Sequence, residues 1–233
     1  MTLPAPAEKR RFVEQMFDRI APRYDLLNRL MTFGVDLRWR HRTIAAAGVR
    51  PGSLVLDLAC GTGDLARDAT AAGARVVGVD SAAQMLRRAQ RRGGAGTLVR
   101  ADGLALPLPD ATFDAVVCGF ALRNFAAQAE TLAECGRVLR PGATLAILEI
   151  DVPTSAPLRL AFDTHLRRVV PLLGRLLVDA PAYAYLSASL AYLPSASDLV
   201  AMLEGAGFDS VGKISLSGGL AQMVTAVRSD ERA

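Results

Sequence analysis

The segment from Leu54 to Asp80 constrains the fold more than any other part of the sequence. Its pattern predicts a strand, a glycine turn, a helix and a second strand, in that order. The first strand is apolar, the turn holds Gly61, Thr62 and Gly63, and the second strand ends on the acid. Glycines let the backbone approach a ligand closely, and the amides that open the next helix point at that ligand. The stretch therefore predicts a binding site for a nucleotide-type cofactor, in which Asp80 accepts hydrogen bonds from two ribose hydroxyls.

The spacing within this stretch leaves two cofactors open. Gly61-x-Gly63-x-x-Ala66 satisfies the dinucleotide fingerprint of NAD-dependent reductases, and Asp80 lies near the offset expected for its ribose acid. Methyltransferases that use S-adenosylmethionine (SAM) share the same elements. Asp57, inside the first strand, favours SAM, because its carboxylate can pair with the ammonium of the methionine moiety but would repel a pyrophosphate.

Two further features favour SAM. A third strand over 97–101 ends at Asp102-Gly103, where the acid can accept a hydrogen bond from an adenine amino group and the glycine leaves room for the ring. Asp-Gly is also a frequent turn pair, so Asp102 could serve the turn alone. The long segment before the first strand suits a helical lid better than a dinucleotide domain, which usually begins near its first strand.

Strand and helix patterns alternate along the chain and predict an α/β fold, with helices on both faces of a mostly parallel sheet. Apolar runs predict strands near 54–58, 75–80, 97–101, 114–119, 144–149, 210–216 and 221–228. Helical patterns lie near 64–72, 82–92, 126–139 and 196–206, and Arg140-Pro141-Gly142 predicts a helix stop and a turn. We divide one domain of 233 residues into a helical lid (1–50), a cofactor-binding core (51–150), a helical insertion (151–195) and a C-terminal helix with strands (196–233).

The composition argues against several classes of protein. No segment reaches the ~18 uninterrupted apolar residues of a membrane-spanning helix, and the N-terminus does not read as a signal peptide. The net charge of +4 owes much to Arg87, Arg88, Arg91 and Arg92 on one predicted helix. Because no aromatics are interleaved, this run predicts a solvated face and no nucleic-acid partner. The 3 cysteines are scattered without metal-ligand spacing, so we expect core positions, no metal, and a reducing cytosol.

Several motifs resemble one family across nearly the whole chain. They are F-D-R-I-A-P-R-Y-D from Phe17, the D-L-A-C-G-T-G-D loop, V-D-S-A-A-Q-M-L, F-A-L-R-N-F, R-V-L-R-P-G and A-Y-A-Y-L-S-A-S. The family is that of the C-methyltransferases of menaquinone and ubiquinone biosynthesis, of the demethylmenaquinone methyltransferase type. The resemblance implies a class I methyltransferase fold, which is a Rossmann-like seven-stranded sheet whose last strand is antiparallel. It also implies SAM as the cofactor, with Met85 and Gly119 among its contacts.

The resemblance also implies catalytic residues. Arg123 and Asn124 follow the fourth strand, at the edge of the sheet where ligands bind in this class of fold. The guanidinium could stabilise a quinol anion while the amide orients a neighbouring oxygen, although an arginine in a surface ion pair would look the same in sequence. Tyr24 on the lid could pack its ring near the sulfonium of SAM.

The general base stays unassigned at this stage. His41, His165 and Asp151 are weak candidates, because no histidine sits where a base is obvious. Tyr183 and Tyr185 are expected either to line the acceptor pocket or to be core tyrosines.

The resemblance implies C-methylation of a polyprenyl naphthoquinol, from demethylmenaquinol to menaquinol. A benzoquinol of ubiquinone synthesis or another small molecule stays open, because Met223 and Val224 stand where family members carry a histidine. An NAD-dependent reductase is the alternative from another class.

The stretch from Leu158 to Leu177 has arginines among apolar residues, so it could lie on an anionic membrane surface or cover the sheet. We expect a cytoplasmic protein, peripheral on the inner face of the membrane if that stretch binds lipid, and leave a homodimer open.

Overall fold

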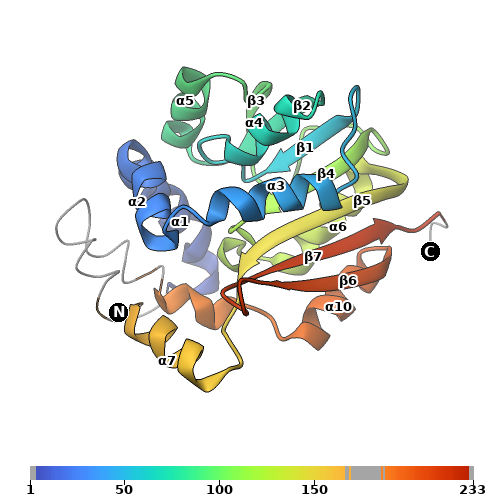
Figure 1. The fold of residues 1–233 in the computed structure, drawn as a ribbon. Helices are drawn as coiled ribbons and strands as arrows, with labels where there is room; N and C mark the ends of the chain where they lie inside the picture. The colour runs from blue at the N-terminus through green and yellow to red at the C-terminus, as the bar shows by residue number, and fades with distance from the viewer. Residues whose placement is uncertain (1–3, 166–167, 169–184, 186, 231–233) are drawn as a thin grey trace.

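The computed structural model describes residues 4–165, 168, 185 and 187–230. Its centre is a sheet with the strand order β3-β2-β1-β4-β5-β7-β6. The strands are β1 (Leu54–Leu58), β2 (Arg75–Asp80), β3 (Thr97–Arg100), β4 (Phe113–Gly119), β5 (Leu139–Ile150), β6 (Phe208–Leu216) and β7 (Ala221–Arg228). Figure 1 shows the sheet crossing the molecule, with β6 and β7 at one edge and β3 at the other.

The pairing of the strands confirms the predicted topology. Strands β1 to β5 pair in parallel, whereas β7 runs antiparallel to both of its neighbours, β5 and β6. The central strands β1 and β4 are buried along almost their whole length, as expected for parallel strands that helices cover on both faces. Their carboxyl ends meet at one edge, where the order reverses between β1 and β4 and where this class of sheet binds ligands.

Helices cover both faces of this sheet. The first three are α1 (Pro6–Ile20), α2 (Tyr24–Thr32) and α3 (Asp36–Ala46), with the short η1 (Ala21–Arg23) between α1 and α2. Next come α4 (Asp64–Ala71), α5 (Ala83–Arg92), η2 (Leu122–Asn124), α6 (Gln128–Val138), α7 (Ala156–Thr164), η4 (Ser189–Tyr192) and α10 (Ala196–Gly205). Ser195 caps α10, because its hydroxyl accepts a hydrogen bond of 3.1 Å from the amide of Asp198.

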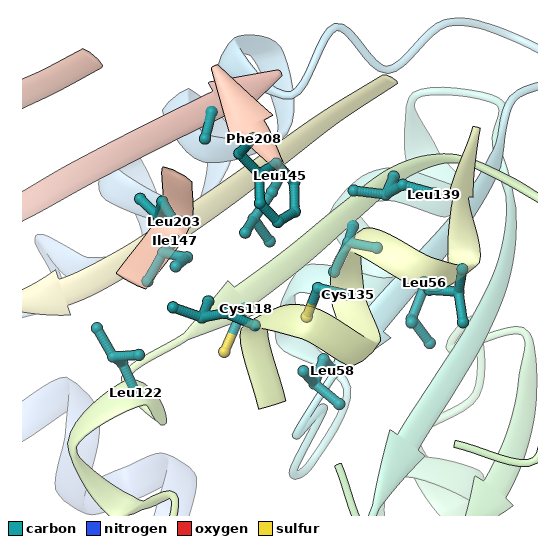
Figure 2. Packing of buried hydrophobic residues seen from close by; sticks show 14 of the residues in the cluster. Leu56, Leu58, Cys118, Leu122, Cys135, Leu139, Leu145, Ile147, Leu203 and Phe208 are labelled. Carbon is teal, nitrogen blue, oxygen red and sulfur yellow. The ribbon is translucent and has the colours of Figure 1, made fainter. Parts of the chain in front are cut away.

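Alternate residues of β1 pack into two separate cores. Leu56 and Leu58 point to one face, where they pack with α6 and α10. Figure 2 shows this cluster, including the buried thiols Cys118 and Cys135 at its centre. Val55 points to the other face, against α3, α4 and α5. The two cores explain why the sheet needs apolar residues on both sides.

The N-terminal segment divides between the sheet and the cofactor edge. On α3, Trp39 packs against β5 and β7, and its indole nitrogen donates a hydrogen bond of 2.9 Å to the Ser217 hydroxyl. Helix α1 instead packs its Met16 and Ile20 against Met85 of α5. The lid that lies over the cofactor edge is therefore α1, η1 and α2, whereas α3 belongs to the layer on the sheet.

Two boundaries differ from the sequence-based expectation. Strand β5 begins at Leu139 and not at 144, because Leu139 still pairs with Phe113 of β4, before a register shift between Phe113 and Ala115. The turn expected at Arg140-Pro141-Gly142 is therefore wrong, since these residues belong to β5, where Gly142 has a φ of +74°. Of the stretch Leu158 to Leu177, only α7 with His165 and Arg168 lies within the described residues. Within the described part of the chain, no helix is both long and apolar enough to span a bilayer.

Candidate active site

A cavity opens at the carboxyl ends of the parallel strands, beneath the lid. It holds about 830 Å³ of unfilled space, part of it open to solvent. Most of the predicted site residues line it, namely Tyr24, Gly61, Asp80, Met85, Asp102, Gly103, Gly119 and Asn124. A smaller cavity of about 290 Å³ adjoins it through Tyr24, Ala59, Gly61 and Gly119, and is lined by Asp57 and Thr62. Gly63 and Arg123 line neither of these two cavities.

The two glycines of the turn serve different purposes. Both have positive φ, +54° at Gly61 and +79° at Gly63. A Cβ added to Gly61 would meet only the Tyr24 ring, at 4.0 Å, so the backbone there faces the cavities. A Cβ on Gly63 would lie 2.9 Å from the Cβ of Ala95. Gly63 therefore lets the loop pack against the protein, whereas Gly61 lets it approach a ligand.

Asp57 has one carboxylate oxygen in use and one free. Its Oδ2 accepts a hydrogen bond of 2.8 Å from the amide of Ala66. Its Oδ1 is buried and has no hydrogen-bond partner among the described residues. Burial raises the pKa of Asp57 to about 8, because a charged carboxylate without a partner is costly in the interior. The site therefore favours a cationic partner for this oxygen.

Asp80 joins the end of β2 to the glycine loop. Its Oδ2 accepts a hydrogen bond from the amide of Gly61, and its Oδ1 accepts one from the amide of Ala82, both at 2.8 Å. Burial raises the pKa of Asp80 to about 6, and these two amides oppose the rise. Carboxylate oxygens carry further lone pairs, so Asp80 can still accept from hydroxyls in the cavity.

Asp102 stabilises the turn that the Asp-Gly pair predicts, and it also pairs with a residue of the lid. Its Oδ1 accepts a hydrogen bond of 3.1 Å from the amide of Leu104, which is an Asx turn. Its Oδ2 lies 2.9 Å from the Nε of Arg10 on α1. Sequence reasoning missed Arg10, because nothing local marks it out from its exposed neighbours on the same helix.

Arg123 lies behind the cavity wall in a buried ion pair. Its guanidinium binds the carboxylate of Glu149 at the end of β5, and each side chain is 3% exposed or less. Its Nε also donates a hydrogen bond of 3.2 Å to the hydroxyl of Ser189 on η4. Sequence reasoning also missed Glu149, although an acid at the end of a buried strand was the available signal.

Asn124 takes the adjacent place on the cavity wall. Its Nδ2 donates a hydrogen bond of 3.3 Å to the carbonyl of Phe120. Its Oδ1 accepts one of 3.3 Å from the hydroxyl of the buried Tyr185. Burial raises the pKa of Tyr185 to about 12, and the positive charge of Arg123 opposes that rise. Tyr183, the other tyrosine of the A-Y-A-Y motif, lies outside the described residues.

Tyr24 places the lid over both cavities. Its ring packs edge-on against Phe17, with centroids 5.9 Å apart. Burial raises the pKa of Tyr24, while the charge of Arg40, the amide of Asn28 and the charge of Arg123 lower it. The phenol is therefore neutral, in a position shared by the two cavities.

An ion-pair cluster fastens the lid to the core. Asp25 on α2 pairs with Arg88 and Arg92 of α5, both at 2.9 Å. Its carboxylate also accepts a hydrogen bond of 2.5 Å from the hydroxyl of Thr62. Arg29 on α2 pairs with Asp64 of α4 at 2.9 Å. The expectation that the whole arginine run of α5 is a solvated face is therefore wrong for its two members that reach the lid.

The three candidate bases lie away from the cavity. His41 is exposed, with its Nδ1 3.6 Å from Asp68. The Nε2 of His165 lies 3.0 Å from the carbonyl oxygen of Met31, at the far end of α2. Asp151 pairs with Lys213 at 2.9 Å. The structure therefore assigns a base to none of them.

A model of the ubiE/COQ5 methyltransferase family matches residues 5–228. The chain belongs to the ubiE/COQ5 methyltransferase family. This membership confirms the resemblance in the motifs. Among curated members, the chain is 46% identical over 200 residues to a demethylmenaquinone methyltransferase of Thermus thermophilus, covering 83% of this chain and 91% of that one. It is 40% identical over 220 residues to a ubiquinone/menaquinone biosynthesis C-methyltransferase of Syntrophotalea carbinolica, covering 92% and 93%.

Solved structures with the same fold lie further away in sequence. A SAM-dependent methyltransferase of Thermotoga maritima superposes with a TM-score of 0.67 at 16% identity, covering 93% of this chain and all of that one. A second, from Aquifex aeolicus, has a TM-score of 0.59 at 19% identity over 81% of this chain and 89% of that one. These two likenesses support the class I methyltransferase fold of this ubiE/COQ5 family member.

The residues of the cavity fit the cofactor of such a methyltransferase. The free Oδ1 of Asp57 suits an ammonium group, and Asp80 suits a pair of hydroxyls. Gly61 leaves its side of the loop open to a ligand. A dinucleotide would bring a pyrophosphate to the same loop, where its negative charge would oppose ionisation of Asp57 and leave the free Oδ1 without a cationic partner.

Proposed function

We propose that this protein transfers the methyl group of SAM to a ring carbon of a polyprenyl naphthoquinol, converting demethylmenaquinol to menaquinol. The observation that supports this most is the shared cavity, which runs from the acids at the strand ends to Asn124 under a lid that carries Tyr24. Cofactor groups and acceptor groups can therefore meet in one space. The likeness to a demethylmenaquinone methyltransferase over most of both chains supports the choice of acceptor.

When bound, SAM supplies an electrophilic methyl group. We propose that Asp57 pairs with its ammonium through the free Oδ1, and that Asp80 accepts from its ribose hydroxyls. Asp102 and Gly103 border the part of the cavity that would take the adenine ring. Thr62, Gly63, Met85 and Gly119 shape the surrounding wall and its loop.

The acceptor carbon becomes nucleophilic when a quinol hydroxyl loses a proton and its oxygen pushes electron density into the ring. In the proposed reaction a new carbon–carbon bond forms to the methyl group, the carbon–sulfur bond of SAM breaks, and the ring proton leaves as the aromatic ring is restored. We propose that Asn124, oriented by Tyr185 and Phe120, holds the acceptor oxygen at the cavity wall. Tyr24 covers the reacting groups and excludes water.

Arg123 acts in this proposal through its field and its neighbours. Its guanidinium is tied to Glu149, so it stands behind Asn124 and does not itself line the cavity. Its charge nevertheless opposes the rise that burial causes in the pKa of Tyr24 and of Tyr185. The same field would favour the anion of a quinol held beside Asn124.

The direct test uses the purified protein, SAM and a short-chain demethylmenaquinol kept reduced. We expect a methylated quinol and an equal amount of S-adenosylhomocysteine by mass spectrometry. Tight retention of NADH with no SAM binding would contradict the proposal in favour of a reductase.

A benzoquinol of ubiquinone synthesis is the second candidate acceptor. The identity to a ubiquinone/menaquinone biosynthesis C-methyltransferase over 92% of this chain favours it. Competing a naphthoquinol and a benzoquinol of equal chain length in one reaction will rank the two acceptors by kcat/KM.

Because either acceptor keeps its tail in lipid, we also propose peripheral contact with the inner face of the membrane. A homodimer stays a separate prediction, to be checked by light scattering.

A further inference from the structure

The lid helix α2 has one face turned to the cavity and another turned to solvent. Tyr24 lines the cavity, and Leu27 is buried at 1% exposure. On the outer side, a row of large apolar side chains is open to solvent: Leu26 at 52%, Leu30 at 40%, Phe33 at 81% and Leu37 at 41%. We name these four residues the outer lid face. Apolar residues clustered in this way mark an interaction surface more often than singly scattered ones do.

The spacing of Leu26, Leu30 and Phe33 places them on one side of α2. Leu26 and Leu30 lie one helical turn apart on α2, Phe33 follows at the end of the helix, and Leu37 lies in the first turn of α3. Phe33 has a left-handed backbone, with φ of 52°, and this conformation ends α2. A bulky aromatic residue is unusual in that conformation, which suits glycine or asparagine better. The ring of Phe33 is also 81% exposed.

The charges of α2 and α3 divide between the two sides. The acids of these helices are Asp25 and Asp36, and both turn inward: Asp25 toward α5, and Asp36, which is 0% exposed, toward Arg29 and Arg40. Arg38 and Arg42 next to the outer lid face are exposed. The exposed charged side chains that α2 and α3 contribute are therefore cationic, and an anionic partner would match them.

Helix α7 brings a second segment of the same character to this end of the molecule. His165, the C-cap residue that follows α7, packs on Phe33 with ring centroids 5.6 Å apart. On α7, Leu160 is 70% exposed and Arg159 is exposed beside it. Figure 1 shows α2 and α7 on the side of the view opposite the C-terminus.

We propose that the outer lid face binds the surface of an anionic lipid bilayer. Apolar side chains bordered by arginines are the pattern that lies in a lipid interface, where the side chains bury in the acyl boundary and the cations meet acidic headgroups. A second copy of this chain would bring the same cations to the face, whereas anionic lipid brings the opposite charge. The reason for such contact rests on the proposed function, since a lid docked on lipid would receive a lipophilic quinol directly from the bilayer.

The test is co-sedimentation of the full chain with vesicles, in the absence of SAM and acceptor. Vesicles of mixed phosphatidylglycerol and phosphatidylcholine are compared with vesicles of phosphatidylcholine alone. We expect binding to the anionic vesicles only, and about a fivefold lower bound fraction for Leu26→Gln/Phe33→Asn. Asparagine tolerates the left-handed backbone of position 33, so this variant keeps the fold.

Two matched controls distinguish binding through the outer lid face from non-specific binding to vesicles. Ile214→Thr removes an equally exposed apolar side chain, 52%, from β6, and should sediment like the wild type. Arg38→Gln/Arg42→Gln should lose binding, whereas Arg87→Gln/Arg91→Gln, which removes two exposed charges from α5, should lose less.

Three outcomes would overturn the inference. One is equal sedimentation of the wild type and the Leu26→Gln/Phe33→Asn variant. The others are equal losses from the two arginine pairs, and a wild-type dimer that this variant turns into a monomer, which would assign the face to a second copy. Methyl transfer to a tail-less quinol in solution is measured separately, so that a failed proposed function and a failed lipid contact give different results.

Discussion

The carboxylate of Asp25 on the lid accepts a hydrogen bond of 2.5 Å from the hydroxyl of Thr62 in the glycine loop. The same carboxylate pairs with Arg88 and Arg92 on α5. One acid of the lid is thus bonded both to the loop that borders the cofactor cavity and to the helix that follows β2. Closure of the lid and order of the loop should therefore depend on each other.

The first prediction concerns this acid. Asp25→Asn keeps the shape of the side chain but removes the charge opposite two arginines, so SAM affinity should fall about tenfold, or ~1.4 kcal/mol. Binding can be followed through the fluorescence of Trp39, the single tryptophan, whose ring lies 6.4 Å from Phe120 of the cavity wall. Glu14→Gln is the matched control, because it breaks a lid ion pair to an arginine that is 59% exposed. Equal affinities for the two variants would contradict the coupling.

The second prediction concerns the pH dependence of stability through Asp57. Its pKa is raised from 3.8 to about 8 in the folded protein. The folded state therefore keeps a proton that the unfolded state has lost, and the stability of the ligand-free protein should fall as pH rises from about 4 to about 8. Asp57→Asn should flatten this fall and should raise the Tm at pH 8 above that of the wild type. Identical slopes of Tm against pH in the two proteins would contradict this account of Asp57.

The third prediction concerns SAM binding by the same group. An ammonium paired with the free oxygen of Asp57 favours the charged carboxylate, so binding below pH 8 should release a proton. Calorimetry in two buffers of different ionisation enthalpy measures that proton. The amino group of SAM titrates in the same range, and Asp57→Asn provides the correction for it. Proton release of the same size in wild type and variant would argue against this pairing.

The fourth prediction separates the structural and functional roles of the buried pair Arg123 and Glu149. Removing one partner leaves an unpaired charge in the interior, so Glu149→Gln or Arg123→Met should each lower stability by about 3–5 kcal/mol. Arg123→Met/Glu149→Leu removes both charges and should recover most of that loss. Our proposal expects the double variant to bind SAM normally but to transfer methyl groups at least tenfold more slowly. Wild-type kcat in the stable double variant would leave the pair with a structural role only.

Much of the fold could be predicted from the sequence because its signals are local. The apolar run Leu54–Leu58, the glycines after it and the acid at position 80 lie close together in the chain, and each has one plausible structural meaning in an α/β sheet. The same locality explains why the places of Asp80 and Asp102 relative to the ends of β2 and β3 could be predicted. Their positions depend on where each strand stops, which Gly61 and Gly103 mark.

The interactions that sequence reasoning missed all join distant segments. Arg88 lies 63 residues from Asp25, and Arg123 lies 26 from Glu149. In sequence, such residues look like ordinary surface charges, because no pattern near an arginine says which acid will face it after folding. The start of β5 was misplaced for a similar reason, since its first residues pair with β4 and do not form an apolar run of their own. The roles of Asn124 and Tyr24 in catalysis stay predictions, and the structure adds the neighbours through which they can be tested.

The fifth prediction tests whether Gly63 is required for packing of the loop, in contrast to Gly61, which faces the cavities. An alanine Cβ at position 63 would stand 2.9 Å from the Cβ of Ala95, at a φ of +79°. Gly63→Ala should therefore lower the free energy of unfolding by about 2–4 kcal/mol, from crowding and backbone strain together. Gly48→Ala, at a φ of +67° with nothing within 4 Å of the new Cβ, carries the strain alone and should cost only ~1 kcal/mol. Urea unfolding with an unchanged m-value measures the loss of stability in both variants. Similar losses would mean that Ala95 moves to accommodate the new methyl group, so that packing does not require Gly63.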